Sequence, residues 1–239
     1  MQNVLTPGWS DLLNGLLHLL YPNLCAGCDA DLPSQHSCFC MVCQRRLHTT
    51  NMHLLAENEF TDRFWGRLPL VSGTALYYFN RKSPIQRALH QLKYRNRPEI
   101  GLSIGRRLGS LLAQSPFFAG ISAIVPVPLH PQKERLRGYN QSALFAQGIA
   151  ESTRIPVESN ILIRRSATST QTKKKRMERF DNVSAVFDLH HPGRLAGKHL
   201  LLVDDVLTTG ATLEACGHVL LTIPGVRLSM ATIAIAMRS

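Results

Sequence analysis

The sequence predicts an α/β protein in which helices flank a mostly parallel sheet and a small cysteine-rich module precedes that sheet. From residue 73 onward, apolar segments of strand length alternate with segments of helical periodicity. The segment 198–203 is wholly apolar after its first two residues, which is typical of a strand buried on both faces of a parallel sheet. Five of the six cysteines lie between residues 25 and 43, ahead of this alternation.

The elements of the main domain follow from these patterns in chain order. Alternating or continuous apolar runs predict strands, and Pro126 and Pro128 stop the second of them. Apolar residues at helical spacing predict the helices between the strands. The expected strands are 74–79, 123–127, 198–203 and 226–235, and the expected helices are 83–92, 104–114, 141–152 and 212–221.

An amphipathic helix is expected ahead of the cysteines, with an apolar stripe formed by Trp9, Leu12, Leu13, Leu16, Leu17 and Leu20. It lacks a basic leader and a small-residue cleavage site, so it does not resemble a signal peptide. Docking onto the body of the protein is favoured, and membrane-surface binding is the minor alternative. We expect three regions: 1–48, the helix and cysteine module; 49–72, a polar, irregular linker anchored by Phe64 and Trp65; and 73–239, the main domain.

Positive charge is concentrated in the middle of the chain. The formal net charge is +11, yet residues 81–180 alone hold nineteen Lys and Arg against five Asp and Glu, a difference of +14. Such a field suits phosphate-rich partners, either a small diphosphate or a nucleic-acid backbone, and a solvated face that aids solubility is the alternative. No stretch approaches the roughly 20 apolar residues of a membrane span, so we expect no span and a cytoplasmic protein.

The cysteine spacing predicts a structural zinc site. Cys25 and Cys28 form one CxxC pair, Cys40 and Cys43 form a second, and eleven residues separate the pairs. Tetrahedral Zn²⁺ takes four thiolates, and each CxxC turn presents two of them to one ion. Cys38 is close enough in sequence to substitute for Cys40. Disulfides are the alternative, which a reducing cytosol disfavours.

A loop suited to a sugar phosphate follows the apolar strand. Asp204 and Asp205 stand at its carboxyl end, where ligands bind in open α/β sheets. The small, hydroxyl-rich turn that follows points backbone N–H groups at an anion, next to a helix N-terminus. The carboxylates would accept hydrogen bonds from sugar hydroxyls, and Mg²⁺ could bridge a diphosphate and those hydroxyls. The ligand-binding residues expected beside the two acids are Val206, Leu207, Thr208, Thr209, Gly210, Ala211 and Thr212.

Residues 200–212, from the apolar strand to the end of the loop, form a thirteen-residue string that resembles the phosphoribosyl-diphosphate signature of type I phosphoribosyltransferases. Further motifs narrow the resemblance. They are Leu92-Lys93-Tyr94-Arg95, Val125-Pro126-Val127-Pro128-Leu129, Arg135-Leu136-Arg137-Gly138-Tyr139-Asn140-Gln141, and Gln171 followed by Arg179, Asn182 and Phe187. In this order, and with the CxxC pairs, the chain is similar to the ComF family of bacterial competence proteins, also described as amidophosphoribosyltransferase-like. The resemblance covers almost the whole chain from about Tyr21, and Lys174 departs from it because the family more often has leucine there.

The resemblance implies a type I phosphoribosyltransferase fold behind a zinc-ribbon-like module, and a role in natural transformation on incoming single-stranded DNA in the cytoplasm. Competence helicase or recombination proteins are the partners that this role implies. The diphosphate needs a second cradle, which we place at 127–130 with Pro128 and Leu129, where Lys93, Arg135 and Arg137 would neutralise charge. A mobile hood resembling that of these enzymes would contain Arg164, Arg165, Gln171 and Arg179. For Arg137 and Asn140, a locally hydrogen-bonded helix N-terminus is the alternative.

Two compatible functions are expected from the chain. One is an enzyme that transfers a phosphoribosyl group to an acceptor, with Asp204 and Asp205 at its catalytic centre. The other is a protein that binds single-stranded DNA through its basic segment, with Lys173, Lys174, Lys175, Arg176 and Arg179 on the phosphates and Tyr94, Tyr139 and Phe180 as stacking platforms. The lysine run could equally be a solvated loop, and the aromatic residues could be core. The alternative to both is a phosphoribosyltransferase that acts on a nucleobase or other small acceptor in nucleotide metabolism.

Overall fold

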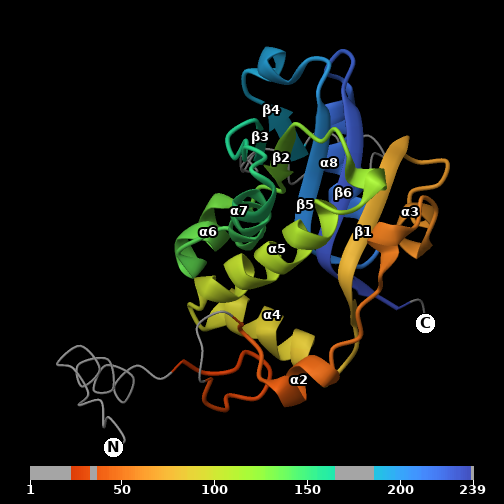
Figure 1. Cartoon of the computed structure of the whole chain (residues 1–239). Helices are drawn as coiled ribbons and strands as arrows, with labels where there is room; N and C mark the ends of the chain where they lie inside the picture. The colour runs from red at the N-terminus through yellow and green to blue at the C-terminus, as the bar shows by residue number, and fades with distance from the viewer. Residues whose placement is uncertain (1–22, 33–36, 165–185, 238–239) are drawn as a thin grey trace, which may run out of the picture.

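A four-stranded parallel sheet forms the centre of the computed structural model, which describes residues 23–32, 37–164 and 186–237 (Figure 1). The strand order is β1-β6-β5-β2, so the first strand of the chain pairs with the last. The strands are β1 (Leu70–Phe79), β2 (Ala123–Pro126), β5 (His199–Leu207) and β6 (Arg227–Ala236). The predicted mostly parallel sheet is therefore confirmed.

Helices cover both faces of this sheet. On one face, Leu201 and Val203 of β5 share a buried cluster with α4 (Pro84–Tyr94), α5 (Pro98–Leu112) and α7 (Gln141–Thr153). On the other face, Leu200 and Leu202 pack in a second cluster with α8 (Ala211–Leu221). Burial on both faces explains why this strand has an unbroken apolar run. In the described parts of the chain, none of the helices has both the length and the apolar composition needed to cross a bilayer.

The strand β5 extends four residues beyond the predicted end at Val203. Its pairing with β2 ends where Pro126 faces Val203, but its pairing with β6 continues to Leu207, opposite Ile235. Within the described segments, the two acids therefore belong to a part of β5 that has a neighbouring strand on one side only. This leaves the β2 side of the carboxyl edge open for side chains from other elements.

Two helices differ from the sequence expectation. The helix α5 begins six residues before the predicted start, in a segment that contains Pro98 and Gly101. Further along α5, a glycine is needed at position 105 because a Cβ atom on Gly105 would lie 2.4 Å from the carbonyl oxygen of Phe145 on α7. The helix α6 (Pro131–Arg137) was not predicted, because it buries none of its residues and so has no apolar periodicity.

The expected linker 49–72 is packed against the sheet and contains the short helices η1 (Met52–Leu54) and α3 (Glu59–Asp62). Phe60 and Phe64 are fully buried, which confirms Phe64 as an anchor. Trp65 was wrongly expected to be an anchor, since 78% of it is exposed. The boundary between linker and main domain remains a prediction.

The other short elements are α2 (Met41–Arg45) in the cysteine module, η2 (Pro116–Phe118) and η4 (Pro192–Leu195). The strands β3 (Leu162–Arg164) and β4 (Phe187–Leu189) form a separate antiparallel pair. The N-terminal helix expected from Trp9 to Leu20 lies outside the described residues.

Replacing Phe64 by alanine should lower the free energy of unfolding by about 3–5 kcal/mol, because it leaves a cavity in the core. The matched control is Trp65→Ala, which removes a larger aromatic ring from an exposed position and should change stability by about 0.5 kcal/mol or less. Denaturant titration of both variants measures the difference. Equal losses would contradict the assignment of Phe64 as the core anchor.

Candidate functional site

The loop between β5 and α8 forms a small hollow at the carboxyl edge of the sheet. Thr208 and Thr209 are exposed at its rim, while Leu207 and Leu213, which precede and follow the turn in the chain, are buried. The hollow has a volume of about 40 Å³ and is lined by Asp204, Val206, Leu207, Thr208, Thr209, Gly210, Ala211, Thr212 and Leu213. The structure therefore brings together the residues that the sequence analysis grouped as a phosphate loop.

Gly210 sets the shape of this loop. It precedes the first residue of α8 with a φ of 85°, in the left-handed region that favours glycine. A Cβ atom at Gly210 would also lie 3.2 Å from the ring of Phe64. A side chain at this position would therefore strain the backbone and press on the core below it.

Two arginines in the segment before β1 form contacts that fix the loop. Arg63 donates one hydrogen bond of 2.7 Å to the carbonyl oxygen of Thr208 and another of 2.5 Å to that of Ala236. Arg67 forms an ion pair with Glu214 in the first turn of α8, with 2.8 Å between Arg67 Nε and Glu214 Oε1. These contacts fix the loop to the last strand and to the segment that was expected to be a linker.

The two acids have different environments. Asp205 forms an ion pair with Lys93 at the end of α4, with 2.6 Å between the carboxylate Oδ2 and Nζ. Asp204 Oδ1 accepts hydrogen bonds from Ser142 Oγ at 2.9 Å and from the backbone N–H of Asp205 at 2.8 Å. Burial, together with the neighbouring charge of Asp205, raises the pKa of Asp204 to about 7. One carboxyl is thus paired with a cation, and the other is poised to exchange a proton near neutral pH.

The segment between α6 and α7 ties three elements together at this site. Tyr139 donates its hydroxyl to the carbonyl oxygen of Leu92 at 2.7 Å, which fixes the end of α4. Asn140 donates to the carbonyl oxygen of Val127 at 3.0 Å, which fixes the loop after β2. Asn140 Oδ1 also accepts from the N–H of Ser142, so the helix N-terminus that was the alternative for this residue is the arrangement observed.

The expected second cradle lies on the same edge of the sheet, because β2 and β5 are parallel neighbours and both end there. Pro128 and Leu129 are half-buried in the loop between β2 and α6. Arg137 donates to Gln141 Oε1 at 2.9 Å, and its guanidinium carbon lies 5.4 Å from the centre of the Tyr94 ring. Arg135 is exposed on α6.

The sequence analysis gave no site role to Ser142 or Gln141. Ser142 contacts Asp204, and Gln141 is buried beside Arg137 with no hydrogen-bond partner for its Nε2 among the described residues. Their position directly after an N-capping asparagine, at a helix start, was the available signal. Tyr139 is half-buried in the core, which favours the packing alternative over a stacking platform for this residue.

Of the expected hood, Arg165, Gln171 and Arg179 lie outside the described residues. The same is true of the other residues expected to contact DNA there, namely Lys173, Lys174, Lys175, Arg176 and Phe180. Arg164 is described on β3, where its guanidinium carbon lies 5.5 Å from the ring centre of Phe187 on β4. The described strands β3 and β4 thus flank the segment that contains the basic run.

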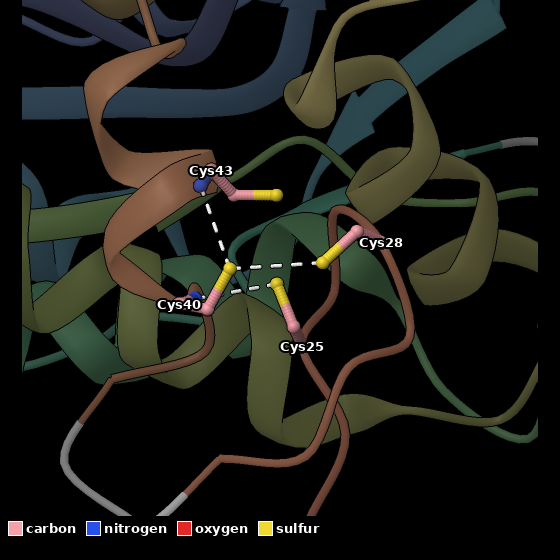
Figure 2. Close-up of side chains that lie close together, drawn as sticks. All are labelled: Cys25, Cys28, Cys40 and Cys43. Carbon is pink, nitrogen blue, oxygen red and sulfur yellow. Dashed lines mark hydrogen bonds between the residues drawn. The ribbon is translucent and has the colours of Figure 1, made fainter.

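The four cysteines of the two CxxC pairs converge as the sequence predicts (Figure 2). Their Sγ atoms all lie within 4.8 Å of one another, and those of Cys28 and Cys40 are 3.6 Å apart. Tetrahedral zinc with Zn–S bonds of about 2.3 Å requires sulfur atoms about 3.8 Å apart. The arrangement therefore fits one zinc ion, which Cys25, Cys28, Cys40 and Cys43 would hold.

Backbone N–H groups point at these sulfur atoms. Cys25 Sγ accepts from the N–H groups of Gly27 at 3.3 Å and Cys40 at 3.2 Å. The N–H of Cys43 lowers the pKa of Cys40 to about 7 and so favours the thiolate that a metal requires. Cys38 is buried in the hydrophobic cluster, and burial raises its pKa to about 11. The converging group contains Cys40 and not Cys38, so Cys38 does not take the place of Cys40 in it.

The cysteine module is fixed to the main domain. Arg97 donates to the carbonyl oxygen of Leu24 at 2.6 Å, and Gln91 donates to that of Ala26 at 3.3 Å and to Asp29 Oδ1 at 2.9 Å. Apolar residues of the module belong to the same buried cluster as α4 and α5. The module and the helix that carries Lys93 are therefore one packed unit.

Comparison with known proteins agrees with this geometry. The family model described as "Phosphoribosyl transferase domain" matches residues 140–237, which run from the cap of α7 past the end of β6. The parallel sheet, the loop after β5 and the four-cysteine cluster thus define the class: a type I phosphoribosyltransferase-like fold preceded by a zinc-ribbon-like module.

Three curated relatives narrow the class. DNA utilization protein YhgH of Escherichia coli (strain K12) is 30% identical over 219 residues, which cover 85% of this chain and 92% of that protein. Competence protein F of Haemophilus influenzae is 27% identical, over 86% of this chain and 87% of that protein. Competence protein ComFC of Bacillus subtilis is 27% identical, over 86% of this chain and 81% of that protein. The chain belongs to the ComF family.

The purified chain should contain one zinc ion, and Cys28→Ser should lose it with little cost in packing, because Cys28 is exposed. Cys38→Ala is the matched control, since it removes a neighbouring cysteine that is not in the converging group and should retain zinc. Elemental analysis measures the metal. Absence of zinc from the wild type, or a disulfide within either CxxC pair, would contradict the zinc site.

Proposed function

We propose that this chain binds phosphoribosyl diphosphate with Mg²⁺ at the carboxyl edge of its sheet and serves natural transformation by handling incoming single-stranded DNA. The observation that carries the first part is the placement of Asp204, a glycine-containing turn and a helix N-terminus around one hollow, with Asp205 next to Asp204 on the same strand. The second part is supported by the names of two relatives, competence proteins F and ComFC.

The loop is suited to the 5-phosphate of the ribose. Its backbone N–H groups and threonine hydroxyls are donors, and the start of α8 adds the positive end of a helix. Asp204 and Asp205 precede this turn on β5, so their carboxylates would accept hydrogen bonds from the 2- and 3-hydroxyls of the same sugar. Phosphate and sugar would therefore be held by consecutive residues of one strand and turn.

Lys93 and Arg137 are suited to the diphosphate. Lys93 lies 2.6 Å from Asp205, so a cation is already present beside the proposed sugar position. Arg137 lies at the end of α6, after the loop that contains Pro128 and Leu129. In a transfer reaction, the bond between ribose C1 and the diphosphate oxygen breaks and the electron pair leaves with the diphosphate. These two cations would stabilise that charge.

The residues present also fit Mg²⁺. In the described parts of the chain, the only cluster of three or more converging His, Cys, Asp or Glu is that of the four cysteines. Asp204 and Asp205 thus do not form a closed cage, and the ion would be held mainly by oxygens of the diphosphate and the ribose. Mg²⁺ commonly binds in this way, through one or two carboxylates together with substrate phosphates. When bound, it supplies further neutralisation of the departing diphosphate.

Replacing Asp204 and Asp205 by alanine should abolish binding of phosphoribosyl diphosphate and lower transformation, while the chain remains folded. Both side chains stand at the carboxyl edge of the sheet and neither belongs to the two hydrophobic clusters, so the core does not depend on them. Thr209→Ala should be milder, because backbone groups supply most of the anion site. Calorimetry measures binding, and wild-type affinity in the double variant would disprove the site.

The pKa of Asp204 leads to a second prediction for the calorimetric titration with phosphoribosyl diphosphate, namely that binding releases a proton. A carboxyl with a pKa of about 7 is half protonated at that pH, whereas hydrogen bonds from sugar hydroxyls favour its ionised form. Binding should therefore release a proton near pH 7 and tighten as the pH rises through that value. Buffers with different ionisation enthalpies detect the release, and Asp204→Asn should eliminate it.

If the variant with alanine at both Asp204 and Asp205 lost binding but transformed normally, the pocket would have no part in transformation.

The distribution of charge along the chain supports the DNA-binding part of the proposal. The excess of +14 in residues 81–180 includes the run of Lys173, Lys174, Lys175 and Arg176. The logarithm of DNA affinity should fall linearly with the logarithm of salt concentration, and replacing this run by alanine should make the slope shallower by up to about 3, at roughly 0.7 per lost phosphate contact. Filter binding across a salt series measures the slope. An unchanged slope would exclude this run, and absence of DNA binding at low salt would refute the DNA function.

Phosphoribosyl transfer to a nucleobase remains the alternative function. Turnover of phosphoribosyl diphosphate with a panel of free bases distinguishes it, because a salvage enzyme would consume one of them and a DNA-handling protein would not.

A further inference from the structure

Two hollows open side by side along α4, outside the phosphate loop. One has a volume of about 450 Å³ and lies between the cysteine module and α4; its lining is Leu24, Asp29, Arg87, His90, Gln91, Arg95 and Arg97. The other has a volume of about 440 Å³ and lies between α4 and α6; its lining is Lys93, Tyr94, Asn96, Lys133, Leu136 and Arg137. The rings of His90 and Tyr94 are 5.0 Å apart, so the two hollows meet on one face of the helix.

The lining carries six Lys and Arg against one acid, Asp29. Two of the cations have carboxylate partners: Arg97 pairs with Glu99 and Lys93 pairs with Asp205. Among the residues that the structure describes, no carboxylate forms an ion pair with the other four, which are Arg87, Arg95, Lys133 and Arg137. The surface thus has an uncompensated positive charge that a polyanion would neutralise.

The same surface exposes flat and apolar groups. Tyr94 is 65% exposed, although its ring is large and stands beside cations. Leu136 on α6 is 87% exposed. Arg87, His90 and Tyr94 follow one another at helical spacing, so a cation and two planar rings share one face of α4. Cations that follow a phosphate backbone, interleaved with rings on which unpaired bases stack, are the features of a site for single-stranded nucleic acid.

We infer that this α4 surface, formed by Arg87, His90, Tyr94, Arg95 and Lys133, binds single-stranded DNA, with a base stacked on Tyr94 and phosphates on Arg87, Arg95 and Lys133. The inference rests on the proposed DNA function and gives it a place among the described residues. Lys93, which borders the second hollow, pairs with Asp205. A bound strand therefore passes from the four-cysteine module to the edge of the proposed phosphoribosyl-diphosphate site.

Two sets of variants of the full, zinc-loaded chain test the α4 surface. Tyr94→Ala should weaken binding of a labelled oligothymidylate about 5- to 150-fold, whereas Tyr94→Phe should retain it, because stacking needs the ring and not the hydroxyl. Arg95→Ala with Lys133→Ala should make the slope of log affinity against log salt shallower by about 1.4, which corresponds to two phosphate contacts on a single strand. The matched control is Arg194→Ala with Lys198→Ala, which removes the same charge just before the amino end of β5, at the opposite edge of the sheet.

Zinc content should equal that of the wild type in all of these variants, which shows that each remains folded. Binding of phosphoribosyl diphosphate should also be unchanged in Tyr94→Phe, which keeps the ring beside Arg137, and in the variants that replace Arg95 together with Lys133 or Arg194 together with Lys198. If the wild type binds DNA and both α4 variants bind it as the control does, the α4 surface is not the site, although the proposed DNA function stands. If Tyr94→Phe loses as much affinity as Tyr94→Ala, stacking on this ring is excluded and the inference fails. If the wild type binds no DNA at low salt, the proposed DNA function fails as well, irrespective of phosphoribosyl-diphosphate binding.

Discussion

The unequal length of two neighbouring strands is the constraint on which the site depends. The strand β2 ends at Pro126, whereas β5 continues to Leu207 and, among the described residues, pairs there with β6 alone. The carboxyl edge therefore has a step, and the ends of other elements fill it. The end of α4 provides Lys93 to Asp205, and the start of α7 provides Ser142 to Asp204. If β2 were as long as β5, its backbone would occupy the place of these side chains.

The second feature of the architecture is that support for the site comes from segments distant in sequence. Arg63 and Thr208 are 145 positions apart, and Tyr139 and Leu92 are 47 apart. The cysteine module contributes as well, because it packs against α4 and α5 in one hydrophobic cluster. Its position is thereby linked to that of Lys93 at the end of α4. A metal in the module would act on the site through helix position rather than through chemistry.

These long-range contacts also explain which parts could be predicted from the sequence. The inner strands could be predicted because burial on both faces imposes apolar runs, and the loop because its residue types suit an anion site. The helix α6 could not, because its side chains are turned to solvent and leave no periodic pattern. The continuation of β5 through two acids could not be foreseen, since it depends on pairing with β6. Ser142 was missed for a similar reason: its partner Asp204 is 62 positions away. Lys93 was expected to face a diphosphate, and its pairing with Asp205 had no local signal.

The shared hydrophobic cluster has a consequence for the life of the protein in a cell. Residues such as Leu89 of α4 and Ile104 of α5 are covered in a cluster to which the cysteine module contributes Leu32, Phe39 and Leu47. A module that folds only around its metal would uncover this apolar surface whenever zinc was scarce. Exposed apolar surface is what chaperones and proteases recognise, and modest losses of stability change abundance several-fold. Zinc supply would then set how much of the protein accumulates, independently of how strongly its gene is expressed.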